Sequence, residues 1–237
     1  MNGKNILVTG ASSGIGYITA KYLNNKGYNC ILLARSKEKL EVLLSELKGD
    51  NIAIPFDLCN LDQIKSVFET CKLHNIKLDG MVHCAGIGVM SPVRLNDINE
   101  MERTMKINYF SFVELVKYFC MRQYSNEDAS IVAVSSISPL TCYPGACNYA
   151  ASKNAINASV KVMAKEYMKR RIRVNAVLPG YVNTPLGPSE DDPVYIAQQP
   201  LGIIKAEYIS YIIYFLLSEK GKYITGTLIP ISGGMSY

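Results

Sequence analysis

Short apolar runs alternate with longer amphipathic stretches along the whole chain, and this alternation constrains the fold more than any other feature. The runs are NILVTG, CILLA, NIAIPF and LDGMVHCAG in the first half, and SIVAVSS, IRVNAVLPG and TLIPIS in the second. Strands that are apolar throughout and separated by helices belong to a parallel sheet that is covered on both faces. The seven runs therefore predict an α/β fold with a doubly wound, seven-stranded parallel sheet.

The length and composition favour one large domain, residues 1–237. A chain of 237 residues of which 49% are hydrophobic can bury a substantial core, and α/β folds of this size commonly stay undivided. The net charge of +5 suits a small anionic ligand but is too mild and too dispersed for a nucleic-acid surface. We therefore expect no nucleic acid among the partners.

The seven cysteines indicate reduced, mostly buried thiols, because they are scattered through apolar segments without CxxC spacing or paired histidines. Neither a disulfide framework nor a metal site is expected. The sequence contains no apolar signal region and no run near the roughly 18 apolar residues of a membrane span. We expect a cytoplasmic protein without a membrane partner.

The segment TGASSGIG, residues 9–16, lies between the first predicted strand and the first predicted helix. In such a loop Gly10 permits the tight turn, Gly14 lets the backbone approach a pyrophosphate, and Gly16 allows close packing of the helix on the strand. The N-terminal amides of the helix add a site for an anion. The segment predicts nucleotide binding, with a merely tight turn as the alternative.

The spacing TGxxxGxG is followed by several further features in order. These are HCAG at residues 83–86, Asn108, Ser136, Tyr149 and Lys153 within NYAASK, and PGYVNT at residues 179–184. With them the chain resembles the short-chain dehydrogenase/reductase family over essentially its whole length. The resemblance implies a Rossmann-type fold and an NAD(P)-dependent oxidoreductase. It implies cofactor contacts at Gly10, Ser12, Ser13, Gly14, Ile15, Gly16, Arg35, Ser36, Asp57, Leu58, Cys84, Ala85, Gly86, Tyr149, Lys153, Pro179, Gly180, Val182 and Thr184.

Arg35 follows the second predicted strand, where the family selects between NAD and NADP. An acidic residue there would accept the adenosine ribose hydroxyls of NAD, whereas a guanidinium suits the 2′-phosphate of NADP. The resemblance therefore favours NADP(H), with NAD(H) as the alternative. Ser36 either caps the next helix or adds a phosphate contact. Ser13 stands where many NADP-using relatives carry a basic residue.

Two more segments carry cofactor contacts by resemblance. Asp57 and Leu58 end the third strand, where the family holds adenine, although Asp57 has helix capping as an alternative role. HCAG departs from the family's usual NNAG, because His83 and Cys84 replace two asparagines. Backbone contacts at residues 85–86 should survive, whereas the usual side-chain bonds that steady the central strand need not. We interpret His83 as a structural residue.

The resemblance assigns catalysis to Asn108, Ser136, Tyr149 and Lys153. Carbonyl reduction needs a hydride, a proton donor and a group that polarises the carbonyl oxygen. Tyr149 would be the acid in reduction and the base in oxidation, while Ser136 holds the substrate oxygen. The Lys153 ammonium, one helical turn from Tyr149, and the oxidised nicotinamide would favour the phenolate. Asn108 would bend a long helix and anchor a relay water. A surface asparagine and the serines beside Ser136 are the alternatives.

The segment TPLGPSEDDPVYIAQQPLG, residues 184–202, breaks the alternation and has no clear period. It is either a surface loop or a lid, ending at about residue 204, because long loops in compact domains are often functional. The resemblance places PGYVNT under the nicotinamide. Tyr143, Pro144 and Tyr181 would line the substrate pocket, with ordinary packing as the alternative.

The general resemblance is to 3-oxoacyl-acyl-carrier-protein reductases and their sugar, polyol and steroid relatives. The reductases that act on the carrier bind it at two basic surface positions, which fall here at Glu127 and Arg170. An acidic residue at that patch repels the acidic carrier, so we expect a small or free carbonyl substrate. Reduction of carrier-bound acyl groups and an idle NADP-binding scaffold or sensor remain alternatives. Family members usually assemble as homo-oligomers, through helices that here span about 97–123 and 148–169, so a tetramer or dimer is expected.

Overall fold

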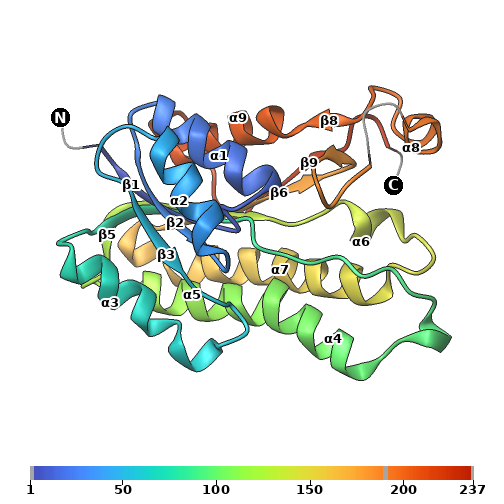
Figure 1. Cartoon of the computed structure of the whole chain (residues 1–237), viewed down its shortest axis with the longest axis horizontal. Coiled ribbons are helices and arrows are strands. Elements are labelled where there is room, and N and C mark those ends of the chain that lie inside the picture. Colours follow the sequence, from blue (N-terminus) through green and yellow to red (C-terminus); the bar gives the residue numbers. More distant parts are fainter. Residues whose placement is uncertain (1–2, 189–191, 236–237) are drawn as a thin grey trace.

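The computed structural model describes residues 3–188 and 192–235. A seven-stranded sheet forms its centre (Figure 1), and the strands follow the order β3-β2-β1-β4-β5-β6-β9, each parallel to its neighbours. The strands are β1 (Asn5–Thr9), β2 (Asn29–Ala34), β3 (Ile52–Pro55), β4 (Leu78–His83), β5 (Ser125–Val134), β6 (Arg173–Pro179) and β9 (Leu228–Ile231). The predicted α/β fold with a doubly wound, seven-stranded parallel sheet is confirmed.

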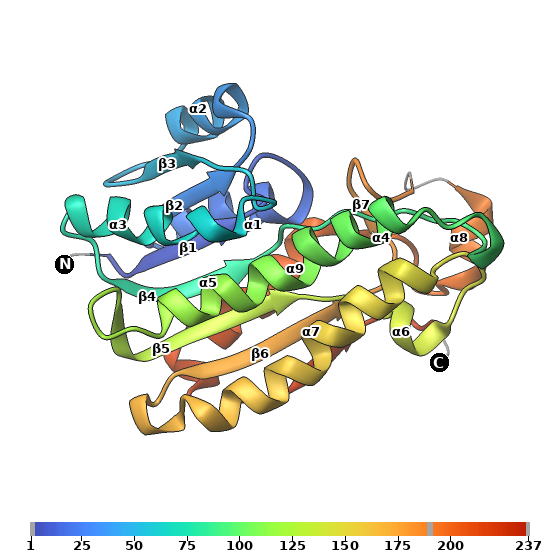
Figure 2. The same cartoon turned by 90° about the horizontal axis from the view of Figure 1, so that it is seen from below.

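Helices cover both faces of this sheet, as Figures 1 and 2 show. One layer contains α1 (Gly14–Asn25), α2 (Lys37–Glu46) and α9 (Ala206–Leu217). The opposite layer contains α3 (Lys65–Leu73), α4 (Ile98–Met105), α5 (Ser111–Phe119) and α7 (Cys147–Glu166). Each layer has its own buried apolar cluster against the sheet. This explains the continuous apolar runs, because alternate residues of each strand face the two clusters.

The long helix expected over residues 97–123 is interrupted. Residues Lys106–Phe110 form a π-turn between α4 and α5, and the Ser111 amide donates to the Lys106 carbonyl, five residues back. Asn108 lies at the centre of this turn and is fully buried. A π-turn shifts the side chains that follow it relative to a regular helix, and such turns are frequent at functional sites.

The strand order reverses between β1 and β4. The chain moves outward from β1 to β2 and β3, then returns to place β4 on the other side of β1. In an open parallel sheet the loops on either side of such a reversal diverge at the carboxyl ends of the strands and leave a crevice. The loops that bound this crevice are the glycine segment after β1 and HCAG at the end of β4.

The segment expected to be a loop or lid contains regular structure. The short strands β7 (Val182–Asn183) and β8 (Ile204–Lys205) pair in parallel at its two ends, and α8 (Pro193–Gln198) lies between them. Residues 189–191 of the predicted lid lie outside the described residues. Asp192 caps α8 by accepting a hydrogen bond from the Val194 amide at 3.0 Å.

The remaining elements are short. They are α6 (Ser138–Thr141) and turns at Leu61–Gln63, Val93–Leu95, Met168–Arg170 and Glu219–Gly221. All seven cysteines are free thiols, but Cys142 and Cys147 are exposed, so fewer are buried than expected. Over residues 3–188 and 192–235, no helix is long and apolar enough to cross a membrane. Over the same residues, no three or more His, Cys, Asp or Glu side chains gather where they could hold a metal ion.

Candidate active site and cofactor cleft

The glycine loop after β1 lies close against the end of β4. Gly10 has a φ of +66°, and a Cβ at this position would lie 2.9 Å from the Ala85 nitrogen. A Cβ at Gly16 would collide with the carbonyl of Gly10, so bare backbone is also needed where α1 begins. Both positions therefore require glycine, one for its φ and the approach of β4, and the other for helix packing.

A cleft of about 320 Å³ opens over this loop. Most of the predicted cofactor residues line it: Gly10, Ser12, Ser13, Gly14, Ile15, Gly16, Arg35, Asp57, Leu58, Cys84, Ala85, Gly86 and Thr184. Residues without an assigned contact also line it, namely Leu33, Ala34, Phe56, Ile87, Ile107, Pro185 and Leu186. Ser36, Tyr149, Lys153, Pro179, Gly180 and Val182 lie outside this lining.

The end of the cleft beside β2 carries an exposed cation. Arg35 is exposed and forms no salt bridge within the described residues. Ser36 caps α2, because its Oγ accepts a hydrogen bond from the Lys39 amide at 3.3 Å. Asp57 accepts a hydrogen bond from the Cys59 amide at 2.9 Å and so turns the chain after β3. Arg35 therefore faces the cleft as a donor, while Ser36 has a capping role.

Tyr149 and Ser136 meet between α7 and the loop after β5. Burial raises the pKa of Tyr149, and a hydrogen bond with the Ser136 side chain opposes this rise. The Ser136 Oγ also accepts a hydrogen bond from the Ser138 amide at 3.0 Å. Its neighbour Ser135 instead donates to the Lys153 carbonyl at 3.1 Å, inside the protein. The structure thus separates the two serines, and only Ser136 contacts the phenol.

Lys153 is 3% exposed, and its Nζ donates to the Val134 carbonyl at 2.9 Å. The Lys153 Nζ lies 5.8 Å from the centre of the Tyr149 ring. The same Nζ would lie 3.1 Å from a Cβ on Gly86, so the lysine also reaches the edge of the cleft. Burial lowers the pKa of Lys153 to about 8. The ammonium therefore lies between Tyr149 and the candidate cofactor cleft.

Asn108 joins three segments around this lysine. Its Oδ1 accepts from the Ile87 amide at 2.8 Å, and its Nδ2 donates to the Ile87 carbonyl at 2.9 Å. The same Nδ2 donates to Ser152 Oγ at 2.9 Å, next to Lys153 in α7. The Asn108 side-chain amide thus pairs with both main-chain groups of Ile87, as a residue of a neighbouring strand would. Asn108 is therefore buried and does not lie on the helix surface.

His83 and Thr9 form a polar contact beneath the cleft. His83 is fully buried, with its Nδ1 3.1 Å from Thr9 Oγ1 and its ring 5.2 Å from that of Phe112. The Ala85 amide donates to the same Thr9 Oγ1 at 3.1 Å. The structural interpretation of His83 agrees with its burial, but its Nε2 has no hydrogen-bond partner among the described residues.

Three tyrosines gather where the lid meets the loops after β5 and β6. The rings of Tyr143 and Tyr181 stack with centroids 6.2 Å apart, and Tyr195 of α8 meets Tyr181 edge to face at 4.5 Å. Such pairs stabilise by about 0.5–1.5 kcal/mol beyond the area they bury. The family resemblance predicts the first two as pocket residues, whereas Tyr195 lies in a stretch of sequence without a clear period.

Gln199 anchors the lid and was also missed. It is fully buried, its Oε1 accepts from the Tyr181 amide at 2.8 Å, and its Nε2 donates to the carbonyls of Tyr181 and Gly202 at 3.0 and 2.6 Å. The Gln199 side-chain amide thus pairs with both main-chain groups of Tyr181, as a residue of a neighbouring strand would. Among uncharged residues in a loop, no sequence signal marks such a contact.

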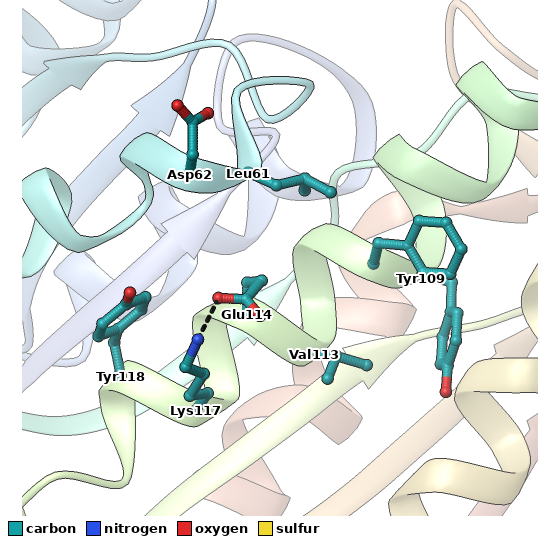
Figure 3. A pocket seen from close by; sticks show the side chains of 8 residues that line it. Leu61, Asp62, Tyr109, Val113, Glu114, Lys117 and Tyr118 are labelled. Atoms are coloured by element: carbon teal, nitrogen blue, oxygen red, sulfur yellow. Dashed lines mark hydrogen bonds and ion pairs between the residues drawn. The ribbon is translucent and has the colours of Figure 1, made fainter.

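A second hollow, of about 600 Å³, lies elsewhere, on the outer face of α5. Figure 3 shows its lining, in which Glu114 and Lys117 pair with each other at 2.9 Å. Tyr109 donates or accepts a hydrogen bond with Ser159 of α7 at 3.0 Å. None of the predicted catalytic residues lines this hollow, so its size does not make it the candidate active site.

Comparisons with known proteins agree with this arrangement. The family model described as short chain dehydrogenase matches residues 4–193. A 3-oxoacyl-[acyl-carrier-protein] reductase of Thermotoga maritima is 34% identical, covering 99% of this chain and 98% of its own. The 3beta-hydroxysteroid dehydrogenase 1 of Eggerthella lenta is 29% identical, covering 100% and 95%. A solved structure of a blue fluorescent protein from a metagenomic library, in complex with NADPH, has a TM-score of 0.93 at 27% identity, covering 100% of this chain and 99% of its own.

Proposed function

Since the chain belongs to the short-chain dehydrogenase/reductase family of NAD(P)-dependent oxidoreductases, we propose that it reduces the carbonyl group of a small substrate with NADPH, or oxidises the matching alcohol. One observation carries this proposal. The Ser136 hydroxyl contacts the Tyr149 phenol, and Lys153, one turn along α7, reaches Gly86 at the edge of the cleft. A proton donor, a polar partner and an ammonium thus converge beside the candidate cofactor site.

The cleft fits a dinucleotide. A Cβ on Gly10 would press on the Ala85 main chain and one on Gly14 would meet Thr184, so the loop stays compact only with glycine at both positions. The loop leads into the N-terminus of α1, where main-chain amides favour a pyrophosphate. The exposed guanidinium of Arg35 supports NADP(H) over NAD(H), because it offers a planar cation to a 2′-phosphate. When bound, NADPH would supply the hydride that the carbonyl carbon receives.

The residues of the chain would supply the proton. Tyr149 gives its phenolic proton to the carbonyl oxygen, so that a carbonyl becomes an alcohol and the tyrosine becomes a phenolate. Burial keeps the phenol protonated before the reaction, which suits an acid in the reductive direction. Ser136 holds the oxygen by a hydrogen bond as it gains negative charge, and the Lys153 ammonium stabilises the phenolate. Asn108 is proposed to hold Lys153 in place through Ser152.

The replacement Tyr149→Phe tests this mechanism. Loss of a positioned general acid typically costs about 10²- to 10⁴-fold, so we expect kcat to fall by about 10³-fold with any accepted ketone. The Kd for NADPH should change less than about threefold, because the ring stays in place. Turnover is measured as loss of NADPH absorbance over a panel of ketones, aldehydes and oxidised sugars. Tyr208→Phe, at a tyrosine that is 58% exposed, is the matched control.

Two results would remove the mechanism. Unchanged turnover in Tyr149→Phe would mean that the phenol is not the acid. Tight NADPH binding with no turnover of any compound by the unaltered protein would instead favour an idle NADP-binding scaffold or sensor. Retention of Asn108, Ser136, Tyr149 and Lys153 argues against that alternative.

The expected substrate is small or free, not carrier-bound. The two positions expected to bind an acyl-carrier protein are Glu127, which is exposed and acidic, and Arg170. The guanidinium of Arg170 already donates to the main-chain carbonyls of Cys120, Ser125 and Asn126, at 2.6, 2.9 and 3.3 Å. Neither residue therefore offers a free cation to an acidic carrier. The names of the reductase relatives keep carrier-bound substrates as the alternative, which assays with free and carrier-bound acyl chains would distinguish.

We also propose that the chain acts in the cytoplasm as a homo-oligomer, with residues 1–237 forming one domain and residues 184–204 its lid. The apolar exposure of Phe110 before α5 and of Val162 on α7 supports assembly through these helices. Phe110 also lines the hollow drawn in Figure 3. Light scattering that gave the mass of a monomer would refute the assembly.

A further inference from the structure

A tight turn follows β9, at residues 232–235, and the proposed mechanism does not use it. The Met235 amide donates to the Ser232 carbonyl at 3.2 Å, and the two residues between them, Gly233 and Gly234, have φ values of +60° and +89°. Side chains rarely adopt such a φ, so the turn favours glycine at both positions. Met235 is 4% exposed. The last residue of the turn is therefore packed inside the protein.

The turn after β9 lies against the end of the lid. The Leu201 amide donates to the Gly233 carbonyl at 2.9 Å. A Cβ on Gly233 would lie 2.5 Å from the Gln199 Cγ, and one on Gly234 would lie 3.5 Å from the Pro200 Cδ. Because 2.5 Å is far inside van der Waals contact, the lid can lie here only if residue 233 is glycine.

Gly180 meets both the lid and the turn after β9. Its amide donates to the Ile231 carbonyl at 2.8 Å, at the end of β9. A Cβ on Gly180 would collide with the Gln199 Oε1, and the same Cβ would lie 3.1 Å from the Met235 Sδ. The family resemblance places Gly180 under the nicotinamide. The end of the lid, the candidate nicotinamide turn and the turn after β9 therefore form one junction.

The junction differs from the rest of the lid in burial. Gln199 is fully buried and Met235 nearly so, whereas no residue of α8 is buried and Val194 of that helix is 62% exposed. Segments with few buried contacts open at a lower free-energy cost than packed ones. The lid thus has a fixed end, at residues 199–202, and a more loosely held helix before it.

We propose that the turn after β9 is a positioning element of the active site, with Met235 as its positioning residue. The Met235 thioether fills the space beside Gly180, and the Gly233 carbonyl holds the lid at Leu201. The lid and the candidate nicotinamide turn are thereby held in one fixed relation. The inference rests on the proposed function, because the groups that Met235 positions are the substrate and the nicotinamide that face Tyr149.

Met235→Ala tests the positioning by kinetics. Removal of the thioether leaves space into which the Gly180 turn relaxes, so we expect kcat/KM for an accepted ketone to fall by about 100-fold, the effect of a misplacement of about 1 Å. The loss should divide into a KM about tenfold higher and a kcat about tenfold lower. The Kd for NADPH should stay within about threefold, because the glycine loop and Arg35 are unaltered.

Two further methionine variants control this test. Met235→Leu keeps an apolar side chain of similar volume and should recover most of kcat/KM. Met168→Ala, at a methionine that is 43% exposed, should behave as the unaltered protein. A purely structural role would lower the melting temperature of Met235→Ala and leave kcat and KM of the folded protein unchanged. That result, or no recovery in Met235→Leu, would contradict the proposal.

Two glycines form a matched pair for the contact with the lid. Gly233→Ala places a Cβ 2.5 Å from the Gln199 Cγ, whereas Gly202, which also has a positive φ, has nothing within 4 Å of its Cβ position. In Gly233→Ala we expect hydrogen exchange at residues 199–204 to quicken by about tenfold and KM to rise by about tenfold. Gly202→Ala should change each by less than about threefold. Equal effects in the two variants would show that this close approach does not hold the lid.

The unaltered protein supplies a test that needs no substrate. The Leu201 side chain is 84% exposed, yet its amide donates to Gly233, so exchange of this amide should be slowed by about 100-fold or more relative to an unfolded chain. A rapidly exchanging Leu201 amide would overturn the proposal, even if Met235→Ala does not fold. If Tyr149→Phe leaves turnover unchanged, the proposed mechanism fails, whereas this protection is measured independently of turnover.

Discussion

The candidate cofactor cleft and the lid beside it are built by different means. Around the cleft, glycines let main chain approach main chain, and Gly10 at the end of β1 nearly touches Ala85 at the end of β4. The lid is held by side chains, because Gln199 pairs with the backbone of Tyr181 and the rings of Tyr143, Tyr181 and Tyr195 pack against one another. A glycine requirement can be recognised in a sequence, whereas a side-chain amide in a loop cannot, so the two regions differ in how far a sequence predicts them.

The replacement Gly10→Ala should have the largest effect on the cleft. The new Cβ would lie 2.9 Å from the Ala85 nitrogen, at a φ of +66° that side chains rarely adopt, so the loop must move. We expect the Kd for NADPH to rise by about 100-fold, measured by the fluorescence of the bound nucleotide. Gly27→Ala is the matched control, because Gly27 also has a positive φ but open space around it.

The control should lose only stability. A non-glycine residue at such a φ costs about 1–2 kcal/mol, so Gly27→Ala should lower the melting temperature and leave the Kd for NADPH unchanged. If both variants bind NADPH as the unaltered protein does, the cleft does not depend on close backbone approach, and the contrast with the lid is wrong.

Arg35→Ala should separate the two nucleotides. A hydrogen bond to a charged group contributes about 1.5–3 kcal/mol, which corresponds to a Kd for NADPH that is about 10- to 100-fold higher. The Kd for NADH should change less than about threefold, because that nucleotide lacks the 2′-phosphate. Titration calorimetry with both nucleotides measures the difference, and equal losses for both would exclude a phosphate contact.

Gln199→Ala should affect the lid alone. Loss of the contacts to Tyr181 and Gly202 frees the lid, so we expect KM for an accepted substrate to rise by about tenfold while the Kd for NADPH stays constant. Hydrogen exchange at residues 192–204 should quicken. Gln198→Ala is the matched control, since Gln198 is exposed and its side chain accepts, within the described residues, a single hydrogen bond, from the Tyr181 hydroxyl. A weaker binding of NADPH in Gln199→Ala would show that the two regions are coupled.

The smallest expected effect is on the pH profile. The pKa of Lys153 is lowered to about 8, so the ammonium loses its proton as the pH rises through that value, while burial keeps the Tyr149 phenol protonated. We expect kcat for reduction to fall by about fourfold between about pH 7 and about pH 8.5. A profile flat to about pH 10 would mean that the lysine is not needed in its charged form.

The sequence predicts the fold well where burial and periodicity agree. Apolar runs predict the seven strands, and amphipathic stretches predict the helices between them, including α9 at residues 206–217. The interrupted helix differs, because a π-turn adds one residue to a turn and leaves no pattern in the composition. Asn108 marks it only through the family resemblance.

In the candidate site, the sequence predicts some of the residues and gives no signal for others. Gly10 and Gly86, to which the resemblance assigns cofactor contacts, both line the cleft. The lid helix α8 was missed although Asp192 followed by Pro193 is a typical start of a helix, a capping residue with proline in the first turn. The contact of His83 with Thr9 and the anchoring of the lid by Gln199 join segments that are separate in the sequence, so no local sequence signal records them.

The pairing of β7 with β8 holds the two ends of the segment between them side by side. Val182 and Asn183 align with Ile204 and Lys205, so the entry and the exit of this segment are joined beside the main sheet without being part of it. An insertion or a transplanted sequence between residues 192 and 203 would keep these two ends together and leave Thr184, Pro185 and Leu186, which line the cleft, in place. Exchanging this single stretch of chain therefore tests whether the proposed lid sets the substrate preference.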